Sequence, residues 1–140
     1  PPVIGASMVM FSDPYNKSLS SDRARVRVLN ASPVAASIDV YLSAPGTDIS
    51  AASVTPTISA ITYKNVGPAS GNDSVEVSAG TYRTTVTLAG TKTVVLTGQL
   101  VLASNKDVLM ITVPNPLSAS ATKALVKVEG TAGVTDLPAN

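Results

Sequence analysis

Hydrophobic and polar positions alternate with a period of two along most of the chain, and helical periodicity is almost absent. Such alternation is typical of half-buried β-strands, because successive side chains point to opposite faces of a sheet. Residues 37–42 show it clearly, since Ile38, Val40 and Leu42 share one face. The pattern predicts eight strands, at residues 23–29, 37–42, 57–64, 74–77, 81–88, 93–102, 108–113 and 123–129.

Turn-forming residues separate these strands about every 8 to 12 residues, a spacing typical of β-sandwiches. We therefore expect an all-β fold, an immunoglobulin-like antiparallel β-sandwich of about eight strands with a strand-forming N-terminal extension. Gly98 interrupts the strand at 93–102 and predicts a bulge or a close approach by another part of the chain. The chain has one phenylalanine and no tryptophan, so the predicted core consists of Val, Leu, Ile and Ala.

An apolar segment precedes the first predicted strand, and we treat residues 1–22 as an extension of the sandwich domain at 23–140. Residues 3–11 carry no charge and alternate in the manner of a strand. A strand that is apolar on both faces is sticky when exposed and suits addition to the edge of another sheet. The candidate subunit-interface residues of this donor strand are Val3, Val9 and Phe11 on one face and Ile4, Met8 and Met10 on the other.

The same segment opens an internal repeat at an offset of 100 residues. Residues 9–28 align without a gap to residues 109–128, with seven identities in twenty, including Met10 with Met110 and Pro14 with Pro114. In the predicted domain, residues 23–29 form the opening strand and residues 108–113 the closing strand. The repeat therefore places a second copy of the closing strand in front of the domain and a second copy of the opening strand behind it. Either the chain belongs to a tandem array, or the strand at 3–11 docks on the next subunit of a head-to-tail filament. Folding back into its own sandwich and forming a tail are the remaining alternatives for that strand.

Composition narrows the functional classes. Only 14% of the 140 residues are charged, against about 25% in ordinary domains, and 44% are hydrophobic. The net charge of +1 provides no basic field for nucleic acid, and no apolar run approaches the roughly 18 residues of a membrane helix. Low charge and abundant Ser and Thr favour an extracellular or cell-surface protein. A start at Pro1-Pro2 without an initiator methionine favours a processed or engineered N-terminus. Arg23, Arg25 and Arg27 are the one basic cluster, and alternation predicts a solvated strand face for all three.

The side chains of common active sites are missing. Without histidine or cysteine, the chain lacks the Ser-His-Asp and Cys-His arrangements, disulfides and the preferred ligands of zinc. Residues 70–74 and 104–107 offer oxygen ligands to calcium, but Asx turns explain the same residues. We expect no enzyme activity, no cofactor and no metal.

Three Asn-x-Ser sequons occur, at Asn16, Asn30 and Asn72. They are candidate glycosylation sites if the source organism attaches N-linked sugars. For Asn30 an Asx cap at the junction of strand and turn is the alternative.

Three stretches resemble a known family. "ARVRVLNASPVAASIDVYL" (residues 24–42), "SAGTYRTTVTLAGT" (78–91) and "LTGQLVLASNKDVLMITV" (96–113) are similar to motifs of the bacterial and archaeal domain of unknown function 4397. Asn30, Val34 and Asn105 depart from the histidine, aspartate and glycine that are common there. The resemblance implies an exported surface β-sandwich, often in tandem copies, and no activity.

Two functions remain. The first is a non-enzymatic structural subunit that builds a surface filament or array by β-strand complementation, as a homo-oligomer or polymer. The alternative is a monomeric surface module that binds a glycan or protein through loops at residues 43–56, 64–74 and 103–107.

Overall fold

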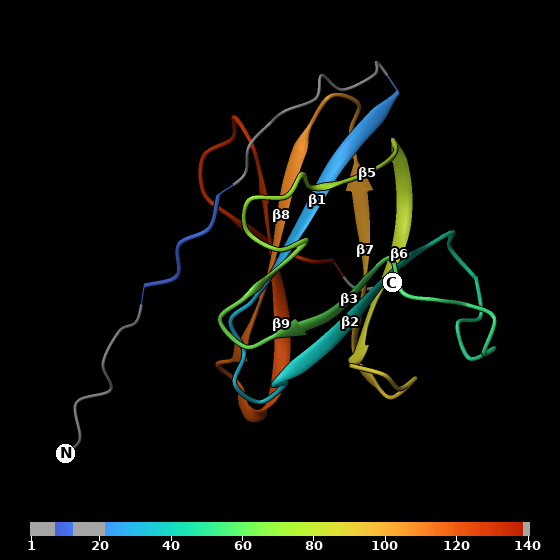
Figure 1. Ribbon diagram of the computed structural model, residues 1–140, viewed down its shortest axis with the longest axis vertical. Helices are drawn as coiled ribbons and strands as arrows, with labels where there is room; N and C mark the ends of the chain where they lie inside the picture. The colour runs from blue at the N-terminus through green and yellow to red at the C-terminus, as the bar shows by residue number, and fades with distance from the viewer. Residues whose placement is uncertain (1–7, 13–21, 139–140) are drawn as a thin grey trace.

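The computed structural model of the protein describes residues 8–12 and 22–138, with backbone alone for residues 118–120. Within these residues the chain forms ten strands and no helix, arranged as two layers (Figure 1). The strands are β1 (Arg23–Asn30), β2 (Ser37–Ser43), β3 (Ile58–Thr62), β4 (Val66–Gly67), β5 (Val75–Ser78), β6 (Gly80–Leu88), β7 (Val94–Leu102), β8 (Asp107–Asn115), β9 (Ser118–Val128) and β10 (Thr135–Asp136).

The two layers differ in size and in strand direction. The first sheet has the order β10–β9–β8–β1–β4, with β5 also paired to β1, and the second has the order β3–β2–β6–β7. β8 and β9 form an antiparallel hairpin, whereas β1 runs parallel to β8, from Arg25 opposite Asp107 to Asn30 opposite Thr112. The all-β, two-sheet architecture is confirmed, but its immunoglobulin-like type is not.

The eight predicted strands are present, and the differences have local causes. β9 begins at Ser118 instead of residue 123, because its pairing with β8 continues past Pro114 to the turn of the hairpin. β4 and β10 were not predicted, since two residues are too few to show a period of two.

The core between the sheets is aliphatic, as the composition predicts. β1 contributes Ala24, Val26 and Val28, and β8 contributes Val108 and Met110. Full burial of one such large apolar side chain stabilises the fold by about 1.5–3 kcal/mol. β9 adds Ala124 and Val126, the turn after β1 adds Ala35, and the second sheet adds Ile38, Val40, Ile58, Ile61, Val86, Leu100 and Leu102.

A fully buried asparagine fixes the end of β1. The amide nitrogen of Asn30 donates to the carbonyls of Ala35 (2.8 Å) and Ile61 (3.1 Å). Its amide oxygen accepts from the backbone N–H of Ser32 (3.2 Å) and the hydroxyl of Thr112 (2.7 Å). One side chain therefore holds the turn at residues 31–36 against β3 and β8. The bond to Ser32 is the predicted Asx turn, which is confirmed.

Candidate functional site

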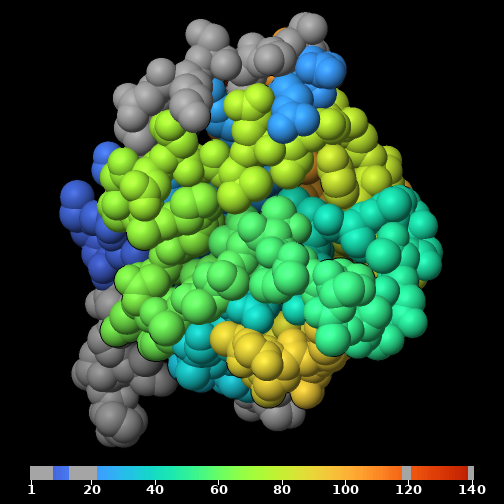
Figure 2. Space-filling view, turned by 45° about the vertical axis from the view of Figure 1, so that its right-hand side comes forward, coloured from blue at the N-terminus to red at the C-terminus, as the bar shows by residue number. Residues whose placement is uncertain are grey.

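Residues 8–12, which include the described part of the candidate donor strand (residues 8–11), lie on the surface and form no strand. Met8 and Met10 are 85% and 83% exposed, whereas Val9 and Phe11 are half-buried. The period-two pattern of the sequence thus appears as an inner and an outer face of an irregular segment, seen in dark blue in Figure 2. Val3 and Ile4 lie outside the described residues.

Two backbone contacts and one ring contact hold this segment against the domain. Ser12 donates its N–H to the hydroxyl of Ser70 (2.8 Å) and accepts from the N–H of Gly71 (2.9 Å). The ring of Phe11 lies over the Arg27 guanidinium, with its centroid 5.7 Å from Cζ. Cation–π contacts of this kind contribute about 0.5–2 kcal/mol. Phe11 also borders an open pocket of about 250 Å³ on the outer face of the first sheet.

Arg27 is a buried structural residue, which corrects the prediction of a solvated basic face. It is 2% exposed, and its guanidinium donates to the carbonyls of Pro68, Ala69 and Asn72, while Nε donates to the hydroxyl of Ser74 (3.3 Å). These contacts fold residues 68–74 over the outer face of β1. A planar guanidinium with five N–H donors suits several carbonyls at once.

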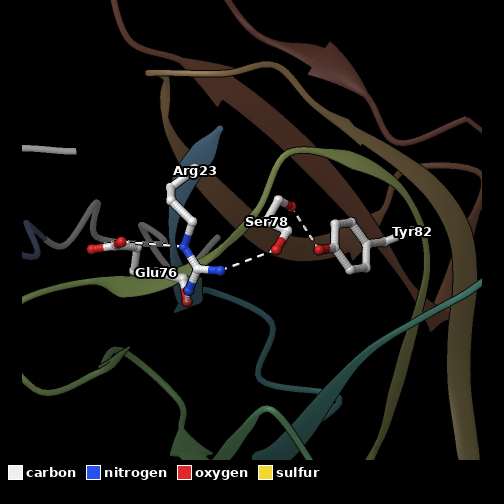
Figure 3. Close-up of polar contacts among 4 residues, drawn as sticks. All are labelled: Arg23, Glu76, Ser78 and Tyr82. Atoms are coloured by element: carbon white, nitrogen blue, oxygen red, sulfur yellow. Dashed lines mark hydrogen bonds and ion pairs between the residues drawn. The ribbon is translucent and has the colours of Figure 1, made fainter. Parts of the chain in front are cut away.

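The other two arginines of the cluster differ from each other. Arg25 is 6% exposed and is likewise buried, so the prediction is wrong for it too. Arg23 is partly exposed and pairs with the Glu76 carboxylate (3.2 Å), and it also donates to the hydroxyl of Ser78 (3.0 Å) (Figure 3). Tyr82 donates to the carbonyl of the same serine (2.6 Å). Arg23 thus joins the start of β1 to β5 at the rim of the sheet.

The internal repeat predicts a position for residues 8–12 beside β1, but other strands already occupy both edges of β1. In the second copy of the repeat, Leu109 to Thr112 of β8 pair antiparallel with Lys127 to Ala124 of β9. The equivalent register would place residues 9–12 beside residues 27–24 of β1. That edge of β1 is already paired with β5 and β4, and β8 occupies the other edge. The segment therefore lacks a place as a strand beside β1.

A second feature is the edge strand β7, which pairs with β6 on one side only among the described strands. On its other side the N–H of Gln99 donates to the carbonyl of Pro138 (2.8 Å). Residues 135–138 reach this point from β9, where Leu137 donates its N–H to Ala124 (3.0 Å) and Thr135–Asp136 form β10. The C-terminal part of the described chain thus crosses from the edge of one sheet to the edge of the other.

Gly98 makes this crossing sterically feasible. A Cβ atom placed there would lie 2.4 Å from Cδ2 of Leu137 and 2.8 Å from the carbonyl oxygen of Pro138. The predicted close approach at Gly98 is therefore confirmed. Leu137 lies between β7 and β9 at this level, packs against the core and borders an open cavity of about 290 Å³.

The same gap stays open toward the start of β7. We call this opening the seam pocket, a cavity of about 300 Å³ between the sheets. Asn30 holds the turn that forms one wall, through its bond to Ala35. The apolar side chains Val34, Leu88 and Val94 at the rim are each about half exposed. Val95 and Thr122 line the pocket together with these three.

The sequons fall in different environments. Asn30 is fully buried and uses its amide group in four hydrogen bonds, so it is not an accessible acceptor for a sugar, and that candidate is corrected. Asn72 is exposed in the loop held by Arg27 and remains a candidate. Asn16 lies outside the described residues.

Two carboxylates among the described residues, those of Asp39 and Asp48, accept backbone N–H groups in turns. Asp39 accepts from the backbone N–H groups of Ala60 (2.7 Å) and Gly90 (2.9 Å). The backbone N–H of Ser50 bonds to Asp48 (2.9 Å) and lowers the pKa of that exposed carboxyl. In the part of the chain that the structure describes, no three metal-ligating side chains of the acidic, histidine or cysteine type lie together.

Asn105 departs from the glycine that is usual in the resembled family, and its backbone explains the choice. Its φ of 60° lies in the left-handed region, which asparagine tolerates better than most residues other than glycine. Its N–H bonds to the carbonyl of Arg23 (2.8 Å), so the turn before β8 meets the start of β1.

Within the described residues, no helix is long and apolar enough to cross a membrane. No family model, curated protein or solved structure matches the chain. The resemblance to the domain of unknown function 4397 therefore stays a prediction.

Proposed function

We propose that this chain is a non-enzymatic structural module of the cell surface, whose copies assemble head to tail through the N-terminal segment. The observation that carries the proposal is the pair Met8 and Met10. Both are almost fully exposed in an uncharged segment of strand-like sequence. Exposed apolar side chains on an alternating segment are the usual donors in strand addition, where pockets receive every second side chain.

A donor strand needs an acceptor strand, and the edge strand β7 is the candidate acceptor. Edge strands expose N–H and C=O groups that template pairing with another chain. β7 has nine residues, and Pro138 provides its one backbone bond outside β6 among the described residues. A donor and an acceptor on different surfaces make a heterologous contact, which extends into a filament unless rotation closes a ring.

The expected strength of one contact is modest. Burying two methionine side chains contributes about 1.5–3 kcal/mol each, while association costs about 4 kcal/mol or more in lost freedom. Isolated copies should therefore assemble only at high concentration. Copies linked in tandem, as the internal repeat suggests, gain a high effective concentration without new contacts.

Negative-stain microscopy and size-exclusion chromatography test this proposal on the chain with and without residues 1–21. We expect concentration-dependent oligomers or filaments from the full chain and monomers after the deletion. Elution that is the same for both at every concentration, with no filaments, contradicts the proposal. The surface location rests on low charge and the family resemblance, and fractionation of the source cells tests it separately.

One observation favours the alternative, a monomeric binding module. The loop after β2 and the outer face of the second sheet border an open cavity of about 330 Å³. Its lining combines polar groups suited to the hydroxyls of a small glycan with an apolar part: Thr47, Asp48, Arg83, Thr85 and Thr97 on one hand, and Gly46, Ile49 and Val94 on the other. A glycan array with the chain and an Arg83→Ala variant tests this function, and saturable binding lost in the variant supports it.

A further inference from the structure

The seam pocket between β7 and β9 has the properties of an acceptor for an added strand. The N–H of Gln99 points away from β6, toward Pro138. Since antiparallel pairing directs alternate residues to the same side, Thr97 also aims its backbone groups away from β6, in a stretch of regular register. An added strand at this edge would hydrogen-bond to β7 and direct alternate side chains between the sheets.

Leu137 demonstrates that the seam accepts an apolar side chain. It enters beside Gly98, where its Cδ2 leaves no room for a Cβ, and it packs against the core cluster. Toward the start of β7, Leu137 borders a cavity of about 290 Å³ that Leu96 and Thr97 also line. Beyond it lies the seam pocket of about 300 Å³, whose lining includes Val34, Leu88, Val94 and Val95. Methionine is unbranched and polarizable, so it fits irregular gaps whose walls carry apolar side chains such as Val34, Leu88 and Val94.

The segment that fits this level belongs to a second copy. In its own chain, the inner face of residues 8–12 is engaged, because Phe11 lies over Arg27 and Ser12 bonds to residues 70 and 71. Those contacts lie on the outer face of the first sheet, and none of the residues around Phe11 lines the seam pocket. The outer face, Met8 and Met10, stays available to a neighbour.

We propose that Met8 and Met10 of one copy enter the seam pocket of the next, beside Val94 and in line with Leu137. The proposal rests on the proposed function and names its acceptor. Residues 135–138 then act as a resident partial strand, and the donor of the neighbour continues it along β7. The contact joins the outer face of the first sheet of one copy to the β7–β9 edge of the next, so it propagates.

Disulfide trapping tests the proposal directly, because the chain has no cysteine of its own. A Met10→Cys chain is mixed with a Val94→Cys chain that carries a mass tag, and the mixture is oxidised mildly. A disulfide requires Cα atoms within about 7 Å, so we expect a mixed dimer in high yield. The matched control is Leu117→Cys, at a 94% exposed position in the β8–β9 turn. Equal yields from Val94→Cys and Leu117→Cys would overturn the proposal.

A charge at the rim provides a second readout that needs no trapping. Val94→Arg should weaken association of the chain about tenfold or more, because the long, charged side chain would occupy the rim at which Met8 and Met10 of the neighbour enter. Val101→Arg is the control, since Val101 lies on the same strand, is 64% exposed against 51% for Val94, and lines no part of the seam pocket. Equal association of both variants and the parent chain would overturn the proposal.

The two proposals fail differently. If the parent chain associates and Met10→Lys abolishes association, while Val94→Arg and the trapping experiment have no effect, the segment is the donor but the acceptor lies elsewhere. If the parent chain does not associate at any concentration, the assembly function itself is refuted and the acceptor with it.

Discussion

Replacing Asn30 by aspartate would convert its two hydrogen-bond donors into acceptors at nearly constant size. The bonds to Ala35 and Ile61 would be lost, and both carbonyls would face a carboxylate in a fully buried site. Unsatisfied buried groups cost about 1–3 kcal/mol each, and an uncompensated buried charge about 3–5 kcal/mol. We expect Asn30→Asp to reduce the free energy of unfolding by about 3–5 kcal/mol at pH 7, from a total of about 5–15 kcal/mol.

The penalty should depend on pH, with a defined sign. Burial and the facing carbonyls raise the pKa of the new carboxyl above its ordinary value of about 3.9. Below that value the carboxyl is protonated in both the folded and the unfolded state, and its O–H can donate to one carbonyl. As the pH rises, the unfolded state ionises first, so the penalty grows until the pH passes the raised folded-state pKa.

Urea unfolding followed by circular dichroism at pH 4 and pH 7 measures this effect. We expect the loss relative to the parent chain to be at least about 1.4 kcal/mol larger at pH 7, the equivalent of one pKa unit. Asn105→Asp is the matched control at an exposed position, where surface changes are usually within about 0.5 kcal/mol. A loss below about 1 kcal/mol at pH 7, or an equal loss at both pH values, would refute the role assigned to Asn30.

Two further predictions concern the buried arginine and the crossing segment. Arg27→Lys should destabilise the fold by about 1–3 kcal/mol and expose residues 68–74 to proteolysis, because an ammonium cannot reach all the carbonyls that the guanidinium bridges; Arg23→Lys, in a partly exposed pair, should cost less than about 1 kcal/mol. Gly98→Ala should cost about 1–3 kcal/mol in thermal or urea unfolding through the clash with Leu137. Adding Leu137→Ala should relieve part of that cost, and strictly additive effects would contradict the contact.

Local patterns in the sequence predict much of the fold. The eight longer strands follow from the period of two, and the aliphatic core follows from the composition. Gly98 marks a close approach because glycine weakens the interior of a strand and is typical of places where another part of the chain comes near. The partner of Gly98, Leu137, was not predictable, since the contact joins two sheet edges that are brought together only by the fold.

The arginines illustrate what local patterns omit. Alternation correctly places Arg25 and Arg27 on the face of β1 opposite its core residues, but it cannot indicate whether that face is covered. The cover over Arg27 comes from residues 68–74 and from Phe11, which lie far away in the sequence. Asn30 is similar: the sequence predicts its Asx turn, whereas its bonds to Ile61 and Thr112 depend on strand packing.

The candidate site was also predictable only in part: its donor residues follow from the sequence, and its acceptor does not. The sequence predicts Met8 and Met10 as donor residues, and their exposure agrees with an available face, although assembly itself stays a prediction. The acceptor was not predictable, because the seam pocket combines side chains from the turn after β1, the end of β6, the start of β7 and β9.

Sedimentation velocity of the parent chain and of a Met8→Lys/Met10→Lys variant, over a wide concentration range, tests the central proposal most directly. Leu117→Lys serves as the control for adding charge at an exposed apolar position. We predict that the parent chain and the control associate as concentration rises, while the double variant remains a monomer with unchanged circular dichroism. Association that is equal in all three chains, or absent from all three, would contradict it.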